Sequence, residues 1–201
     1  MPNPAALIRA ERLGFSYPGL MLLHDLSFDI QPGLTLVRGG DGRGKSTLLR
    51  LLAGVMQPTQ GILYRLGGSV FWAQPANPDD DALTGLQWLQ ARRAEFPSWD
   101  DRAEEALLEP FGLLEHIGKP LYMLSTGSRR KVWLVAARAC RAQVTLLDMP
   151  YSALDGPSRR QVSAILAEAA GDRLRAWVVA DYDLPDTLSG VALAATIDLG
   201  E

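Results

Sequence analysis

The chain has 201 residues, 47% of them hydrophobic and 21% charged, a composition that predicts one globular domain with a full core. Its net charge of −3 gives no overall basic character, so nucleic-acid binding is not expected. The single Cys140 excludes an internal disulfide, two histidines disfavour a histidine-based metal site, and no apolar run is long enough for a signal peptide or a membrane span.

The first third of the chain predicts strands followed by a helix. Short apolar runs bounded by Pro-Gly turns predict strands over residues 7–17, 22–30 and 34–37. The next apolar residues recur at helical spacing over 46–53, and this helix is expected to end near Gly54. A glycine-rich loop therefore lies between a strand and a helix.

That loop, residues 39–47, reads GGDGRGKST and matches the pattern G-x-x-x-x-G-K-[ST]. In this motif glycines let backbone N–H groups surround phosphate oxygens at a helix N-terminus, the lysine reaches the β- and γ-phosphates, and the serine binds Mg²⁺. The loop predicts ATP and Mg²⁺ as ligands. Its candidate binding residues are Gly39, Gly40, Asp41, Gly42, Arg43, Gly44, Lys45, Ser46 and Thr47.

The remaining chain alternates between helical and extended patterns. Short strands are expected at residues 62–64 and 70–72 and a helical segment at 85–114. Further strands are expected at 144–147, 176–180 and 195–199, and a further helix at 158–170. Asp148 follows the buried strand 144–147. Because ligands of open α/β sheets bind beyond the carboxyl ends of the strands, Asp148 is expected to face the same phosphates as Lys45.

Five motifs in a fixed order carry a family resemblance: the loop, Gln74, LSTGS at 124–128, LLDMP at 146–150 and SALD at 152–155. With them the chain resembles an ATP-binding cassette (ABC) ATPase over essentially its whole length. The resemblance implies an α/β fold with a P-loop NTPase core and a mostly parallel sheet. It also implies an N-terminal antiparallel β-subdomain and an inserted helical subdomain at about 75–130, all within one nucleotide-binding domain, residues 1–201.

The same resemblance implies roles for single residues. Tyr17 would stack on adenine, Gln74 would link Mg²⁺ and the γ-phosphate to the helical subdomain, and Asp148 would hold Mg²⁺ through water. Two plainer readings stay open: Tyr17 packs beside the Pro18 turn, or Gln74 is an ordinary loop residue.

LSTGS resembles the family signature LSGGQ, whose serine and backbone N–H groups close over the γ-phosphate of the opposite subunit. Ser125 and Gly127 match this signature, whereas Thr126 and Ser128 depart from it. The resemblance adds Ser125, Gly127, Ser128 and, from SALD, Asp155 to the nucleotide-binding set. A plain helix N-cap is the alternative role for Ser125.

Two positions depart from the family where catalysis occurs. Met149 stands where the family has the glutamate that polarises the attacking water, and a thioether cannot accept that proton. Tyr182 stands in place of the switch histidine, and its hydroxyl can donate one hydrogen bond without a charge at neutral pH. The sequence therefore predicts a chain that binds ATP and hydrolyses it poorly, unless another carboxylate replaces Met149.

A third departure lies within the phosphate loop. Asp41 would repel a γ-phosphate, and Arg43 could offset that repulsion. Because aspartate readily hydrogen-bonds the backbone of turns, an outward Asp41 bonded to the local backbone is favoured.

The resemblance implies the ATP-binding subunit of an ABC transporter of the small single-cassette exporter type. Its partners would be a second cassette, as homo- or heterodimer, and a separate transmembrane permease that holds it on the cytoplasmic face of the membrane. In a heterodimer this chain would be the degenerate half. Trp88 and Trp99 either line the docking groove or belong to the core. The alternative function is a nucleotide-dependent structural or regulatory module.

Overall fold

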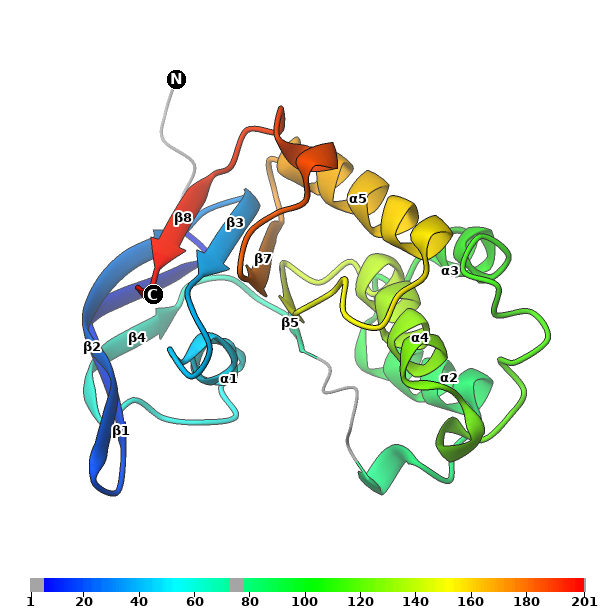
Figure 1. Cartoon of the computed structure of the whole chain (residues 1–201), viewed down its shortest axis with the longest axis horizontal. Helices are drawn as coiled ribbons and strands as arrows, with labels where there is room; N and C mark the ends of the chain where they lie inside the picture. The colour runs from blue at the N-terminus through cyan, green and yellow to red at the C-terminus, as the bar shows by residue number, and fades with distance from the viewer. Residues whose placement is uncertain (1–5, 73–77, 201) are drawn as a thin grey trace. The chain divides into compact units, whose positions relative to one another are not determined.

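A computed structural model describes residues 6–72 and 78–200 of the chain (Figure 1). Gln74, a predicted nucleotide ligand, lies outside these residues. The central sheet has the strand order β5-β6-β7-β3-β8, and the pairs β3–β7, β3–β8 and β6–β7 are parallel. Its strands are β3 (Gly33–Arg38), β5 (Val70–Trp72), β6 (Val144–Asp148), β7 (Ala176–Asp181) and β8 (Ala195–Asp198).

A second, antiparallel sheet is built from the N-terminal strands in the order β2-β1-β4, namely β1 (Ile8–Tyr17), β2 (Leu20–Ile30) and β4 (Gln60–Arg65). Gly19 occupies the tight turn between β1 and β2 with a φ of 78°, a conformation that suits glycine. With the mostly parallel central sheet and the helices, this sheet confirms the predicted α/β fold class.

Helix α1 (Lys45–Ala53) follows β3 directly and packs against β6 and β7. Its leucines recur at helical spacing and are buried, and this burial anchors the helix through the hydrophobic effect. The helix ends at Gly54, whose φ of 81° is the left-handed cap that glycine adopts without strain. The helix therefore begins and ends at glycines.

The expected helical segment 85–114 consists of two helices, α2 (Gly85–Glu95) and α3 (Asp101–Leu108). Pro97 lies in the break, and Asp100 caps α3 by accepting a hydrogen bond from the N–H of Ala103 at 3.1 Å. The remaining helices are α4 (Thr126–Ala139), α5 (Gly156–Ala170) and the short 3₁₀ turns η1 (Pro78–Asp80), η2 (Leu121–Met123) and η3 (Asp186–Leu188). The periodicity was continuous in sequence, but a proline and a cap divide it.

Trp88 of α2 is a core residue, since it is 1% exposed and its ring lies 4.7 Å from that of Trp133 on α4. Trp99 is half-buried, and its indole N–H donates to Glu104 at 2.7 Å. Of the two readings for these tryptophans, the core reading therefore describes Trp88. Cys140, which follows α4, is also buried.

The contacts divide the chain into two compact units. The first unit contains the chain through Phe71, residues Gln143–Met149 and the chain from Leu166 onward. The second unit contains Trp72–Ala142 and Pro150–Ile165, so the boundary crosses α5. None of the helices in residues 6–72 and 78–200 combines the length and hydropathy that a bilayer span requires.

Candidate functional site

Three parallel strands of the first unit end at the same edge of the central sheet (Figure 1). Arg38 at the end of β3 is opposite Asp181 at the end of β7, and Asp148 of β6 is opposite Ala180. This register brings the phosphate loop, Asp148 and the residues after β7 together, although they are far apart in sequence. Asp148 and Lys45 line the same pocket.

The loop is shaped so that only glycine fits before α1. Gly44 is the N-cap residue with a φ of 94°, and a Cβ atom there would lie 2.8 Å from the Cδ2 of Leu23. Because Gly44 has no side chain, the first backbone N–H groups of α1 are left to a ligand. Such a helix N-terminus attracts an anion, so the local backbone fits a phosphate.

Lys45 is 8% exposed and folded back onto the loop. Its Nζ donates to the carbonyl oxygen of Gly39 at 2.6 Å and to that of Gly40 at 2.9 Å. The N–H of Gly40 in turn donates to the carbonyl oxygen of Gly200 at 2.9 Å, which fastens the loop beyond the end of β8. The loop thus holds in place the ammonium group that would help it to bind phosphate.

Tyr182 contacts the loop from the end of β7. Its hydroxyl donates a hydrogen bond to the carboxylate of Asp41, and the Nζ of Lys45 lies 4.4 Å from the centre of its ring. The hydrogen bond to Asp41 and partial desolvation raise the pKa of Tyr182, so its hydroxyl stays protonated at neutral pH. The N–H of Tyr182 donates to the side chain of Asp181 at 2.8 Å, which orients this turn.

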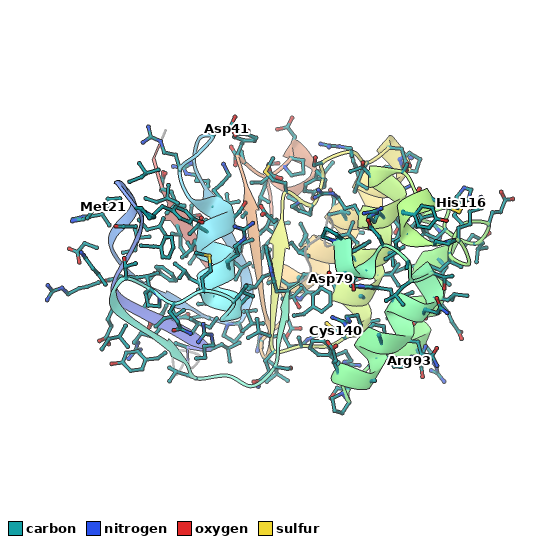
Figure 2. All side chains as sticks on the ribbon, turned by 90° about the horizontal axis from the view of Figure 1, so that it is seen from below. Met21, Asp41, Asp79, Arg93, His116 and Cys140 are labelled. Atoms are coloured by element: carbon teal, nitrogen blue, oxygen red, sulfur yellow. The ribbon has the colours of Figure 1, made fainter. Side chains whose placement is uncertain are left out.

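Asp41 lies at the exposed tip of the loop (Figure 2). The sequence favoured an Asp41 carboxylate that accepts a hydrogen bond from the local backbone, whereas the described bond comes from the hydroxyl of Tyr182, 141 residues away. The difference has a physical reason: the β3–β7 register brings the two turns side by side, and no local pattern encodes that register.

These residues surround a hollow of about 400 Å³. Most of the predicted first-unit site residues line it, together with Leu20 and Leu22, which the sequence analysis did not single out. An apolar strand residue carries no chemical signal, so only the strand pairing reveals that role. The lining residues are Tyr17, Leu20, Leu22, Gly40, Asp41, Gly42, Arg43, Gly44, Lys45, Ser46, Thr47, Asp148, Met149 and Tyr182.

Tyr17 and Met149 both line this pocket. Tyr17 packs edge-on against Phe15 with ring centres 5.0 Å apart, and the residue is 38% exposed. Met149 follows Asp148 with a φ of 48°, and its N–H donates to the carbonyl oxygen of Ala180 at 2.8 Å. Met149 places a thioether directly after Asp148, where the family resemblance implies a water-activating glutamate.

The signature segment belongs to the second unit. The hydroxyl of Ser125 accepts a hydrogen bond from the N–H of Ser128 at 3.0 Å and donates to its hydroxyl at 2.9 Å. Ser125 therefore caps α4, as its plainer reading expected. At Gly127 a Cβ atom would lie 2.4 Å from the carbonyl oxygen of Ala153, so this position requires glycine.

Asp155 connects two helices of the second unit. Its carboxylate accepts from the Nζ of Lys131 on α4 at 2.6 Å and from the N–H of Ser158 in α5 at 2.8 Å. The hydrogen bond from Lys131, followed by that from Ser158, holds the pKa of Asp155 well below its usual range. Asp155 is therefore a charged cap of α5, whatever else it contacts.

The two histidines of the chain lie outside the pocket around Lys45. His24 is an exposed residue of β2, and His116 lies in the second unit, where its ring contacts the ammonium of Lys119 at 3.0 Å (Figure 2). Neither residue lines the pocket around Lys45.

Comparisons with known proteins identify the family and relatives of the chain. The family profile described as ABC transporter matches residues 23–152. The chain is 34% identical over 179 residues to the cytochrome c biogenesis ATP-binding export protein CcmA of Alkalilimnicola ehrlichii, covering 81% of this chain and 75% of that protein. It is 30% identical over 185 residues to the aliphatic sulfonates import ATP-binding protein SsuB 1 of Rhodococcus jostii, covering 88% of this chain and 73% of that protein.

Among solved structures, the fold is similar to a dimeric ATP-binding cassette in a post-hydrolysis state with bound ADP and Pi. The TM-score is 0.71 at 17% identity, and the match covers 88% of each chain.

Proposed function

Because the chain belongs to the ABC transporter family of ATP-binding subunits, we propose that it binds Mg-ATP in the pocket around Lys45 and hydrolyses it weakly or not at all. The loop amides, the N-terminus of α1 and Lys45 would hold the phosphates, and Tyr17 would contact the base. Ser46 and Asp148 would bind Mg²⁺, which when bound would neutralise phosphate charge. By resemblance, Gln74 would join Ser46 and Asp148 in binding Mg²⁺.

Met149 is the observation that carries the proposal of weak hydrolysis. It lines the pocket directly after Asp148, and its thioether has no basic oxygen to take a proton from water. Loss of a general base typically costs about 10²–10⁴ in rate without weakening binding. Tyr182, in the position of the switch histidine, offers only a neutral hydroxyl.

The domain organisation follows as part of the same proposal. Residues 1–201 would be one nucleotide-binding domain, with a helical subdomain at about 75–130. Helices α2 and α3 and the start of α4 lie in that range. This subdomain would pass the effect of ATP to a separate transmembrane permease.

We place a second cassette among the proposed partners, as in the dimeric cassette with similar fold. In that arrangement Ser125, Gly127, Ser128 and Asp155 would face the nucleotide of the opposite subunit. This chain keeps the serine and glycine of the signature at Ser125 and Gly127, but it has Met149 in place of the family's glutamate. It would therefore be the degenerate half of a heterodimer. One similar relative is named for export and another for import, so the transport direction stays outside the proposal.

Single-turnover hydrolysis tests the proposal. Mg-ATP binding and hydrolysis are measured for the native chain and for Met149→Glu combined with Tyr182→His, with Lys45→Ala as the control that should lose binding. We expect binding by the native chain and a rise in rate of at least about 100-fold in the double variant, because a base is restored. Robust hydrolysis by the native chain would contradict the proposal.

Purification of the transport complex tests the heterodimer. The proposal expects a second, different cassette that carries glutamate and histidine at the two degenerate positions. A complete, active complex with two copies of this chain alone would show that part to be wrong.

A further inference from the structure

The ammonium of Lys45 already contacts the phosphate loop and the ring of Tyr182. An ammonium has three N–H donors, and two of those on Lys45 point to the carbonyl oxygens of Gly39 and Gly40. The ring of Tyr182 covers the same group at 4.4 Å, within the range of cation–π attraction. A phosphate oxygen that approaches Lys45 must therefore use its third N–H, beside the ring of Tyr182, or replace one of these contacts.

Asp41 holds Tyr182 in that position. The tyrosine hydroxyl donates to the carboxylate, and the two residues come from turns that follow the paired strands β3 and β7. Both side chains are exposed, so the core does not dictate this contact. The carboxylate also places a negative charge in the loop that would hold phosphates.

Asp41 and Tyr182 affect the terminal phosphate of a nucleotide more than the inner phosphates. In such loops the backbone N–H groups cradle the α- and β-phosphates, and the lysine reaches the β- and γ-phosphates. A diphosphate would keep the amide contacts and would meet Lys45 through its β-phosphate alone. A triphosphate adds negative charge near Asp41 and needs the ammonium that the ring covers. The repulsion between two unit charges about 4 Å apart in water is about 1 kcal/mol, which is roughly fivefold in affinity.

We propose that Asp41 and Tyr182 are specificity residues that disfavour a terminal phosphate, so that the pair must separate before a nucleoside triphosphate engages Lys45. The inference rests on the proposed nucleotide binding at this loop. It adds that the ratio of triphosphate to diphosphate affinity is set by two residues outside the G-x-x-x-x-G-K-[ST] consensus positions. Neither residue is a catalytic group in this role, because each acts on the approach of the phosphate.

Calorimetric titration of the full chain with Mg-ADP and with the Mg²⁺ complex of a non-hydrolysable ATP analogue tests the inference. The variants are Asp41→Asn, which removes the charge, Tyr182→Phe, which removes only the hydroxyl, and Tyr182→Ala, which also removes the ring. Tyr64→Ala is the matched control, because Tyr64 is an exposed tyrosine of the first unit outside the pocket. Circular dichroism checks that every variant folds.

We expect Asp41→Asn and Tyr182→Ala each to lower the Kd ratio of triphosphate to diphosphate by about fivefold, mainly through tighter triphosphate binding. Tyr182→Phe should lower it less, since the ring remains over Lys45, and Tyr64→Ala should leave it as in the native chain. Ratios that do not change would overturn the inference. Weaker triphosphate binding in Tyr182→Ala would also overturn it, because Tyr182 would then be a ligand of the phosphate. If the native chain binds neither nucleotide, the proposed function itself fails.

Discussion

At the scale of single residues, Gly127 is held by a contact that admits no side chain. A Cβ atom there would lie 2.4 Å from the carbonyl oxygen of Ala153, a backbone atom in a residue with a φ of 60°. Gly127→Ala should therefore lower the free energy of unfolding by about 1–3 kcal/mol through overpacking. Urea denaturation followed by tryptophan fluorescence measures the change.

Gly118→Ala is the matched control within the second unit, because no heavy atom of residues 6–72 and 78–200 lies within 4 Å of its Cβ position. It should alter the free energy of unfolding by less than about 1 kcal/mol. Equal destabilisation by both variants would mean that the contact with Ala153 is not the cause.

The residues that sequence reasoning could find are those with chemistry in a local motif. Lys45 and Ser46 follow from one glycine-rich pattern, and Asp148 follows from a buried strand that ends in a carboxylate. The contact between Asp41 and Tyr182 could not be found in this way. It depends on which strands are neighbours and in which register, and those are properties of the folded sheet.

At the scale of elements, Asp155 joins the N-terminus of α5 to Lys131 of α4. Asp155→Asn keeps an acceptor for the N–H of Ser158 and removes the charge. Because exposed ion pairs contribute little, it should lower the free energy of unfolding at pH 7 by up to about 1 kcal/mol. Asp155→Ala should cost about 1 kcal/mol more, since the cap is lost as well.

The same contact predicts a pH dependence. The pKa of Asp155 is depressed in the folded state, so its stabilising effect is present above the unfolded-state pKa of about 4 and is lost as the pH falls below that value. The difference between the native chain and Asp155→Asn should be constant from pH 7 to 5 and shrink below pH 4. Denaturation curves across this range measure it, and a difference that grows in acid would exclude this account.

Elements with strong periodicity were predicted within a few residues, as α1 and the strands of the central sheet illustrate. The division of the segment 85–114 was missed, because apolar spacing continues on both sides of Pro97. A helix boundary set by a cap, such as Asp100, depends on one hydrogen bond that hydrophobic periodicity does not report.

At the scale of the whole molecule, every described residue that lines the pocket belongs to the first unit. A ligand stabilises the state that binds it, by about 2.7 kcal/mol at a concentration of 100 Kd. Mg-ADP should therefore slow amide hydrogen exchange most in the phosphate loop, in α1 and after β7, and least in α2 and α3. Lys45→Ala is the control that should lose this protection, and uniform slowing in both units would contradict the prediction.

The strand order of the central sheet has a consequence for synthesis. β3 lies between β7 and β8, which come more than a hundred residues later in the chain. At about 5–20 residues per second, a ribosome needs of the order of ten seconds to make these neighbours after β3 has emerged. During that time β3 is an unpaired apolar strand and a template for wrong association. The phosphate loop thus acquires its shape late, so newly made chains pass through an aggregation-prone stage before they can bind any nucleotide.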